Sequence, residues 1–336
     1  PAESPFHYRN KLEYSFASTP SGPALGFHRA GRWDELIAID HCHIASDRSN
    51  EVRQGFERWA GEHGLQVYDQ RTGTGFLRHL VVREGVRSGE LLALLVTAEG
   101  ALPDTDGLAA ALPQSVVGVL HAVNNGVAEV THGLPSSLVY GRDWYEERIG
   151  GLRLKVSAGA FMQTNTLMSE RLYRTAIEFA EITGDDIVWD LYCGAGALGL
   201  LAAEAGAGAV YGIEIHPESV ERAKENALVN GLPVEFVTGD VARAVRPLLG
   251  RAPAPTVALV DPPRAGLTPR AVRRVIELAP RRLVYVSCNP TTLAPNCAQL
   301  AGAGYRLDRV QPVDMFPHTP HIECVALLRR ELEAAD

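Results

Sequence analysis

The sequence predicts an α/β protein in which a parallel, doubly wound sheet follows a smaller, β-rich α+β domain. Up to about residue 155, short apolar stretches alternate with turn residues, whereas after Phe161 the pattern changes to strand, glycine turn and helix. Repeated βα units are typical of a parallel sheet with helices on its faces. We therefore expect a β-rich α+β domain at residues 1–155 and an α/β domain at residues 156–336.

Short strands dominate the prediction for the first half. The second and third of the expected strands flank a turn at residues 87–90, which predicts a hairpin. Helical periodicity is clearest at residues 51–60. The expected strands are residues 36–39, 75–83, 91–97 and 118–123.

The second half alternates strands with helices. A glycine turn follows the first of its strands and opens a helix rich in Leu and Ala, and another helix is expected at residues 217–230. We expect the last strand to join the sheet as an antiparallel addition. The expected strands are residues 187–192, 209–214, 234–237, 256–261, 283–286 and 323–328.

Composition limits the classes of protein that fit. No apolar run approaches the roughly 18 residues of a membrane span, and the five cysteines are sparse and odd in number, which favours a reducing cytoplasm and free thiols. A net charge of −8 argues against a general nucleic-acid coat. We expect a cytoplasmic monomer with, at most, a local basic face beside Cys288. That face would consist of Arg270, Arg273, Arg274, Arg281 and Arg282.

A nucleotide-binding turn is predicted at residues 194–199, which read GAGALG and satisfy G-x-G-x-x-G between a strand and a helix. Glu214 lies 20 residues after Gly194, at the end of the next strand, where its carboxylate can accept hydrogen bonds from a ribose. The turn alone would suggest NAD. Asp190, just before the turn, would repel a pyrophosphate but could bind a cationic amino acid, which favours S-adenosylmethionine.

Cys288 has the setting of a reactive thiol. It follows an expected buried strand and precedes Asn289-Pro290, which must end that strand. The thiol therefore lies at the carboxyl end of the sheet, where open α/β sheets bind ligands. An isolated cysteine is more often a small core residue. We expect that role for Cys193, Cys297 and Cys324.

A thiol and a carboxylate in this setting suit the methylation of a pyrimidine ring. Carbon 5 of uracil is a poor nucleophile, but a thiolate that adds to carbon 6 makes it electron-rich. The reaction needs a cysteine of depressed pKa and a separate base, which we predict to be Cys288 and Glu323. A metal site H-x-x-H-x-E, with His318 and His321, lacks further ligands at metal-type spacing.

Five sequence blocks together resemble the RNA uracil-5-methyltransferase family, which makes 5-methyluridine in ribosomal and transfer RNA. They occur in the family's order, and the match runs from about Tyr8 to Leu328. The resemblance implies a class I (Rossmann-like) methyltransferase sheet. The blocks are residues 159–165 (GAFMQTN), 190–196 (DLYCGAG), 261–266 (DPPRAG), 287–290 (SCNP) and 316–323 (FPHTPHIE).

The resemblance also implies roles for single residues. It implies that Cys288 is the nucleophile and Glu323 the base. It also implies that S-adenosyl-L-methionine is the cofactor. The implied partner is RNA, with ribosomal RNA (23S rRNA) favoured over transfer RNA. At Ala197 many relatives carry a polar residue, so a side-chain contact there is not expected. The residues implied to contact the cofactor are Gln163, Tyr192, Glu214, Asp240 and Asp261.

Cys42, within residues 39–44 (IDHCHI), resembles the last of four cysteines that hold a [4Fe–4S] cluster in the ribosomal branch. The other three would precede it, and the printed chain has no cysteine there. A single cysteine cannot hold such a cluster. We therefore expect the cluster, and the family's small N-terminal RNA-binding barrel, only in a longer protein, with Cys42 as a possible single ligand.

Three alternatives stay open on the sequence. An RNA cytosine-5 methyltransferase would use similar covalent chemistry, but its second cysteine normally follows the Asp-x-Pro turn, where this chain has Pro263-Arg264. An NAD-dependent oxidoreductase would share the glycine turn and leave Cys288 and Glu323 without a role. A non-catalytic RNA-binding protein would need neither the thiol nor the cofactor pocket.

Overall fold

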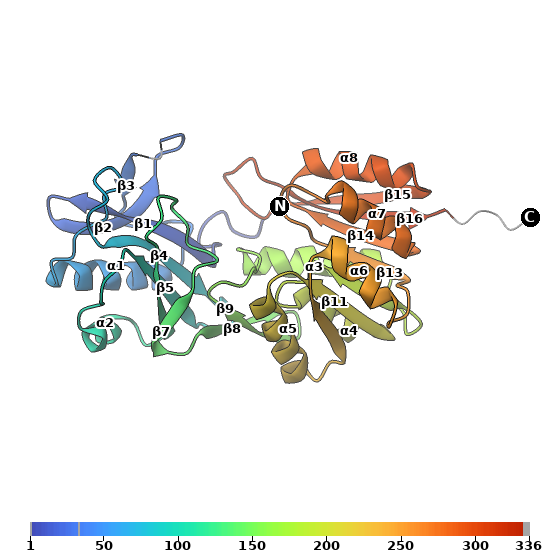
Figure 1. Cartoon of the computed structure of the whole chain (residues 1–336), viewed down its shortest axis with the longest axis horizontal. Helices are drawn as coiled ribbons and strands as arrows, with labels where there is room; N and C mark the ends of the chain where they lie inside the picture. Colours follow the sequence, from blue (N-terminus) through green and yellow to red (C-terminus); the bar gives the residue numbers. More distant parts are fainter. Residues whose placement is uncertain (1, 33, 332–336) are drawn as a thin grey trace, which may run out of the picture. The chain divides into compact units, whose positions relative to one another are not determined.

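The computed structural model describes residues 2–32 and 34–331 and contains two units, each with its own seven-stranded sheet (Figure 1). The amino-terminal unit comprises residues 6–148 and 156–159. The carboxy-terminal unit comprises residues 149–155 and 160–331, together with residues 2–5. Within the described ranges, none of the helices combines the length and the apolar character needed to cross a membrane.

One sheet forms the body of the amino-terminal unit. Its strands are β1 (Lys11–Thr19), β2 (Gly22–His28), β3 (Leu36–Ala38), β4 (Leu77–Glu84), β5 (Leu91–Thr97), β6 (Val116–Val123) and β7 (Ser136–Gly141), in the order β3-β2-β1-β4-β5-β6-β7. Neighbouring strands are antiparallel except β5 and β6, which are joined through helix α2 (Thr105–Ala111). Helix α1 (Asp47–Glu62) packs on β2 and β4 and begins at Ser46, whose hydroxyl accepts the N–H of Ser49.

The predicted hairpin is confirmed by β4 and β5, which pair antiparallel with Leu80 opposite Leu95. Every residue of both strands is buried, because each strand has a neighbour on both sides and the sheet carries α1. The polar residues of β4 therefore need internal partners. Arg78 donates to the backbone oxygens of Asn124 (2.6 Å) and Gly126 (2.8 Å).

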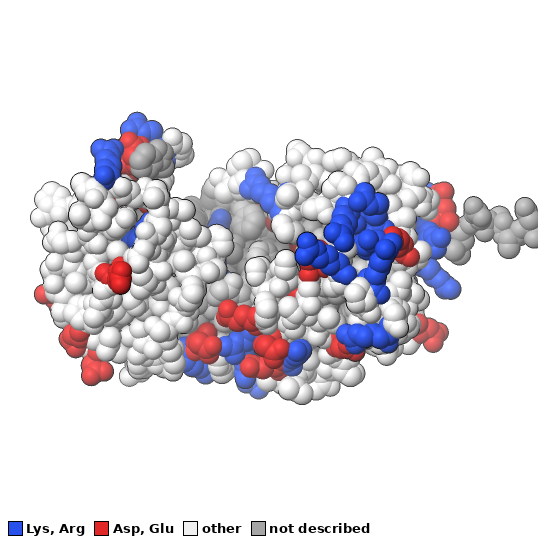
Figure 2. Space-filling view, viewed as in Figure 1, with Lys and Arg blue, Asp and Glu red and all other residues white. Residues whose placement is uncertain are grey.

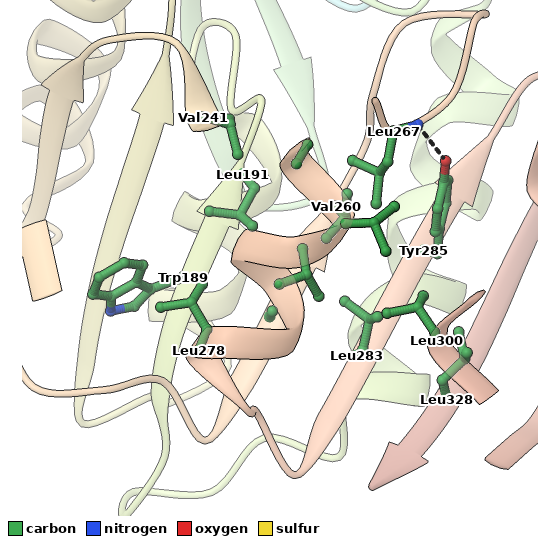
Figure 3. Packing of buried hydrophobic residues seen from close by; sticks show 14 of the residues in the cluster. Trp189, Leu191, Val241, Val260, Leu267, Leu278, Leu283, Tyr285, Leu300 and Leu328 are labelled. Carbon is green, nitrogen blue, oxygen red and sulfur yellow. Dashed lines mark hydrogen bonds between the residues drawn. The ribbon is translucent and has the colours of Figure 1, made fainter. Parts of the chain in front are cut away.

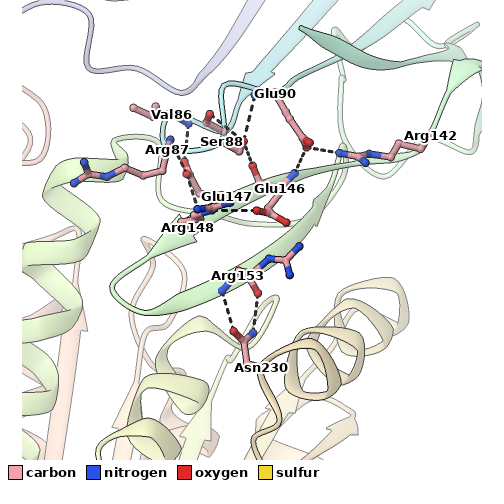
Figure 4. Close-up of polar contacts among 11 residues, drawn as sticks. Val86, Arg87, Ser88, Glu90, Arg142, Glu146, Glu147, Arg148, Arg153 and Asn230 are labelled. Carbon is pink, nitrogen blue, oxygen red and sulfur yellow. Dashed lines mark hydrogen bonds and ion pairs between the residues drawn. The ribbon is translucent and has the colours of Figure 1, made fainter.

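Strands β8 (Trp144–Ile149) and β9 (Leu152–Ser157) form a two-stranded sheet. The chain leaves one unit and enters the other within these two strands. In the amino-terminal unit, the buried Glu147 carboxylate accepts the backbone N–H groups of Val86 (3.0 Å) and Arg87 (3.2 Å), which ties the β4–β5 turn to β8 (Figure 4). In the carboxy-terminal unit, Asn230 bonds both the N–H and the C=O of Arg153. The predicted division after residue 155 stays a prediction, because the chain changes unit at more than one point between residues 148 and 160.

The sheet of the carboxy-terminal unit has the order β12-β11-β10-β13-β14-β16-β15. The first five strands of that order are parallel, and β16 and β15 are antiparallel additions. The strands are β10 (Ile187–Leu191), β11 (Ala209–Glu214), β12 (Val234–Thr238), β13 (Val257–Val260), β14 (Arg282–Ser287), β15 (Tyr305–Val313) and β16 (Glu323–Arg330). The helices are α3 (Thr166–Ala180), α4 (Ala197–Glu204), α5 (Pro217–Asn230), α6 (Val241–Leu249), α7 (Pro269–Leu278) and α8 (Pro290–Ala301).

The main apolar core of this unit lies between the sheet and helices α6, α7 and α8. Inward-facing strand residues such as Trp189, Leu191 and Leu283 pack there against Val241 of α6 and Leu278 of α7 (Figure 3). Burying such side chains contributes about 1.5–3 kcal/mol each. Helices α3, α4 and α5 contact the sheet separately, with α3 against β14 and β16 and α5 against β12.

The predicted fold class is confirmed, and the six strands expected in the second half are β10 to β14 and β16. Helix α5 has the predicted bounds, and β16 is antiparallel as expected. No sequence pattern predicted α6, which contains Pro247, or β15, an edge strand in which most residues are exposed. An edge strand needs no apolar alternation on its outer side, so its pattern is weak.

Candidate active site

The carboxyl ends of five parallel strands meet at one edge of the carboxy-terminal sheet, which is the usual ligand-binding edge of such folds. Most of the predicted site residues lie there. Tyr192 follows β10, Glu214 ends β11, Asp240 precedes α6, Asp261 follows β13 and Cys288 follows β14. The tertiary structure thus brings together residues that are spread over almost 100 positions of the chain.

The turn between β10 and α4 has left-handed backbone at Tyr192 (φ 72°), Gly194 (φ 53°) and Gly196 (φ 88°). A Cβ at Gly196 would lie 2.7 Å from the Phe236 ring, so packing requires that glycine. A Cβ at Gly194 would meet only the backbone oxygen of Phe161, at 3.6 Å, which leaves the turn open to a ligand. Tyr192 is not a glycine, and its conformation costs about 1–3 kcal/mol.

The Glu214 carboxylate is oriented by two backbone groups. It accepts the N–H of Gly194 at 3.1 Å and the N–H of His216 at 2.9 Å. Each carboxylate oxygen keeps a further lone pair. Glu214 therefore fixes the glycine turn and can still accept hydrogen bonds from ribose hydroxyls.

Asp190 is a buried carboxyl with an unfilled acceptor. Its Oδ2 accepts the N–H of Gly199 at 2.8 Å, but its Oδ1 has no hydrogen-bond partner. The pKa of Asp190 is raised to about 8, mainly by burial and also by the charges of Asp261 and Glu214, while the Gly199 hydrogen bond opposes the rise. Asp190 lines a small cavity with Tyr192, and a cationic ligand there would satisfy it.

Asp261 and Gln163 lie together at this edge. The Gln163 side chain donates to Oδ2 of Asp261 at 3.5 Å, and burial raises the pKa of Asp261 to about 7. Asn165, two residues after Gln163, caps α3 by accepting the N–H of Met168 and donates to the backbone oxygen of Met315. This capping fixes the segment that carries Gln163.

Cys288 and Glu323 face one another through the register of β14 and β16. Ser287 pairs with Cys324 in that antiparallel ladder, so the next positions along the two strands are Cys288 and Glu323. Cys288 lies just beyond the last pair of the ladder, and the charge of Glu323 contributes to the raised pKa of Cys288, so the two groups lie near one another. The thiol and the carboxyl are therefore neighbours, although 35 residues separate them.

The pKa values of Cys288 and Glu323 are both raised in the structure, whereas the sequence predicted a depressed pKa for the Cys288 thiol. Burial raises the pKa of Cys288, with Glu323 and Asp261 adding to the rise and Arg264 opposing it. The expected depressed pKa of the Cys288 thiol is therefore wrong for the ligand-free chain. Burial, followed by the charge of Asp261, raises the pKa of Glu323 to about 8, and one Glu323 oxygen has no hydrogen-bond partner.

Arg264 is a cation whose charge acts on Cys288. It is exposed in the loop after Asp261, its Nη2 lies 3.5 Å from Nδ1 of His321, and its charge favours the Cys288 thiolate. The alternative of a metal at His318 and His321 gains no support, because no group of three possible ligands occurs within residues 2–32 and 34–331.

Cys42 lies in the amino-terminal unit, apart from these residues in sequence and fold. It is buried in the apolar core, and its backbone N–H and C=O both bond the Asn50 side chain, at 2.8 and 3.1 Å. In the part of the chain that the structure describes, no group of three or more possible metal ligands includes it. These residues do not fit a [4Fe–4S] cluster. Cys193, Cys297 and Cys324 are buried, as expected.

The basic face expected beside Cys288 is wrong for two of its members. Arg281 and Arg282 lie at the start of β14, whereas Cys288 follows its end. Cys288 is six positions after Arg282 along the strand, a distance of about 20 Å at 3.3 Å per residue. Arg282 instead bonds Asp186 at the opposite edge of the sheet. The remaining arginines are on α7.

The sequence did not assign several residues of the cavity lining to the site, and two of them are aromatic. Tyr173 of α3 and Phe161 line it together with Asp190 and Tyr192. Phe161 is 63% exposed, and an exposed aromatic within the block at residues 159–165 was an available signal. Tyr173 gave no signal, because a helical aromatic residue normally belongs to the core.

The chain is similar to known RNA methyltransferases. A family model described as tRNA (uracil-5-)-methyltransferase matches residues 254–331, and a model described as a methyltransferase domain matches residues 182–246. An "uncharacterized RNA methyltransferase" of Clostridium acetobutylicum is 35% identical over 332 residues, which cover 98% of this chain and 72% of that protein. One from Caldanaerobacter subterraneus subsp. tengcongensis is 38% identical and covers 97% and 73%.

A solved structure is similar over nearly the whole chain. The crystal structure of Pyrococcus abyssi tRNA (uracil-54, C5)-methyltransferase in complex with S-adenosyl-L-homocysteine superposes with a TM-score of 0.83 and 30% sequence identity. The match covers 98% of this chain and 77% of that one.

Proposed function

Because the chain belongs to the uracil-5-methyltransferase family of RNA methyltransferases, we propose that it transfers a methyl group to carbon 5 of a uridine through a bond between Cys288 and carbon 6. S-adenosylmethionine supplies the methyl group as an electrophilic sulfonium. The observation that carries this proposal is the register that sets Cys288 opposite Glu323 beside the glycine turn.

The reaction balances with these two residues. The Cys288 thiolate adds to carbon 6, and the electron pair of the C5–C6 double bond moves into the ring as an enolate. Carbon 5 then takes the methyl group. Glu323 removes the proton from carbon 5, and the thiolate leaves as the double bond is restored. A carboxyl whose pKa lies near 8 suits a base that works near neutral pH.

The thiolate must form in the complex, because the pKa of Cys288 is raised in the ligand-free chain. Arg264 is the group that favours the thiolate, and Glu323 and Asp261 oppose it. Protonation of the two carboxyls, whose pKa values lie at about 8 and 7, removes that opposition. We propose that Glu323 is largely protonated and Asp261 about half protonated near pH 7 when the thiolate forms, and that Glu323 loses this proton to solvent before it takes the proton from carbon 5.

The cofactor pocket is proposed at the glycine turn. Glu214 would accept from the ribose, Asp190 offers its unfilled oxygen to the ammonium group, and Asp240 and Tyr192 flank the turn. Gln163 and Asp261 would lie between the cofactor and the target base. Their hydrogen bond is long, at 3.5 Å, so either side chain can turn toward a ligand at little cost.

We propose ribosomal RNA as the first substrate to test, because the Cys42 segment resembles the ribosomal branch. Transfer RNA is the second, since the similar archaeal enzyme acts on uracil 54 of tRNA. No step is routed through an iron–sulfur cluster, because no group of three or more possible metal ligands occurs within the described residues. Mass spectrometry of ribosomal and transfer RNA from a deletion strain would identify the RNA by one missing 5-methyluridine.

The division of labour between Cys288 and Glu323 provides the direct test. Cys288→Ala should abolish both methyl transfer and the protein–RNA adduct. Glu323→Gln should abolish turnover but accumulate an adduct that survives denaturing gel electrophoresis, because the base acts after the covalent bond exists. Cys297→Ala and Cys324→Ala are matched controls and should keep both activities. Turnover by Cys288→Ala, or an adduct through another cysteine, would refute the mechanism.

A further inference from the structure

Helices α6 and α7 carry five arginines on a chain whose net charge is −8. We call this set the α6–α7 arginine surface: Arg243 and Arg246 of α6, and Arg270, Arg273 and Arg274 of α7. Figure 2 shows lysine and arginine side chains gathered over these two helices. Glu277 of α7 is the only acid within the two helices.

The two helices form one surface rather than two. Arg274 donates to the backbone oxygen of Ala242 in α6 at 3.1 Å. Arg246 of α6 and Arg274 of α7 both bind Glu277, at 2.8 and 2.5 Å. Hydrogen bonds from Arg246 and Arg274 lower the pKa of Glu277 to about 2, so it stays ionised.

Glu277 therefore forms ion pairs with Arg246 and Arg274, and the other three arginines of the surface have no ion pair with it. Arg243, Arg270 and Arg273 are exposed, and none of the ion pairs within the described residues includes them. Some other exposed arginines of this unit do have an acidic partner, such as Arg251 with Glu235. A cluster of like charges without counter-charges repels itself and favours a polyanion.

The position of the surface relates it to the candidate active site. Helix α6 follows Asp240, and α7 follows the loop that starts at Asp261, so both helices begin at the edge that carries Cys288. Arg243 is the third residue of α6, and Arg270 is the second of α7. At 1.5 Å per residue, both lie within about 5 Å of their helix starts along the axis.

We propose that the α6–α7 arginine surface binds phosphates of the RNA chain that flank the target uridine. This inference rests on the proposed function for the class of partner. Arginine binds phosphate with a planar fork of donors, and contacts of this kind position a nucleic acid without reading its sequence. The surface would hold the strand while one nucleotide reaches Cys288.

The test is a triple variant of the full chain, Arg243→Gln, Arg270→Gln and Arg273→Gln. Its affinity for a fluorescein-labelled oligouridine, measured by anisotropy over a salt series, should fall at least about tenfold. The slope of log affinity against log salt should decrease by about 2, because each lost phosphate contact on a single strand contributes about 0.7. Calorimetry with S-adenosylhomocysteine and thermal unfolding would show that the fold is intact.

A second triple variant matches the loss of charge elsewhere in the unit: Arg174→Gln on α3, with Arg306→Gln and Arg309→Gln on β15. It should leave the salt slope unchanged. An equal decrease for both triple variants, or no decrease for the first, would overturn the inference. The readout is RNA binding, so a chain that binds through this surface without transferring a methyl group would refute the uridine chemistry and still support the surface.

Discussion

Asp186 and Asp190 lie four residues apart, at opposite edges of the carboxy-terminal sheet, and their surroundings are opposite in kind. Both are buried. Asp186, just before β10, accepts from the backbone and hydroxyl of Thr183, from Thr256 and from Arg282. Burial pushes its pKa upward, but the hydrogen bonds from Thr256, Arg282 and Thr183 outweigh this, and the pKa of Asp186 is lowered.

Asp190, near the end of β10, receives one hydrogen bond and keeps an oxygen without a partner. Burial raises its pKa to about 8, and Glu323 and Asp261 at the same edge are raised to about 8 and 7. A folded protein normally satisfies its buried polar groups. At the edge of Asp186 the buried carboxylate is fully hydrogen-bonded and stabilises the fold. At the edge of Asp190 buried oxygens lack partners, and this is where a ligand is expected.

The largest expected effect is a difference in stability between variants of Asp186 and variants of Asp190. Asp186→Ala leaves Arg282 without its carboxylate and should lower the free energy of unfolding by about 3 kcal/mol, as measured by urea denaturation. Asp190→Asn replaces a carboxyl that is largely protonated near neutral pH, and should leave stability there unchanged or raise it. A loss of similar size in both variants would show that the two edges do not differ in this way.

A smaller effect concerns ligand affinity at the carboxyl edge. Glu214→Ala should weaken binding of S-adenosylmethionine or S-adenosylhomocysteine by about 1–3 kcal/mol in calorimetry, because a buried hydrogen-bonding carboxylate is lost. Glu235→Ala, an exposed residue of β12, serves as the control and should not change affinity. Binding of NAD, with neither adenosyl compound bound, would contradict the proposed pocket.

The last comparison concerns the pH dependence of stability. Asp190, Asp261 and Glu323 have raised pKa values in the folded chain, so between their unfolded values near 4 and about 7–8 the folded state binds more protons. Stability should therefore fall as pH rises through this window, by up to about 1.4 kcal/mol per pH unit for each extra proton.

This measurement is cleanest above about pH 6.5, the unfolded pKa of histidine. Burial lowers the pKa of His79 to about 4, which makes stability rise with pH below that point and opposes the carboxyls there. Asp190→Asn should reduce the slope between about pH 6.5 and 8. A slope that is unchanged in this variant would show that Asp190 is not protonated in the folded chain.

The order of strands and helices in the second half could be predicted because most of these elements have a hydrophobic pattern that is visible in their own residues. β11 and α5 were found with their bounds, since an apolar run and a helical repeat are properties of neighbouring residues. The glycine turn and the position of Cys288 after a strand were equally local. β15, α3 and Tyr173 of the cavity were missed, because their exposure or burial depends on distant parts of the chain.

The sequence by itself determined the fold class and which residue types end the strands: Glu214, Asp261, Cys288 and, at the start of the last strand, Glu323. Only the tertiary structure decided how these groups interact. The β14–β16 register sets Cys288 opposite Glu323, and the direction of β14 moves Arg282 to the far edge. Patterns along the chain fix local conformation, whereas pairing, burial and pKa are set by neighbours in space, which is why Asp186 and Asp190 read alike in sequence and differ in the fold.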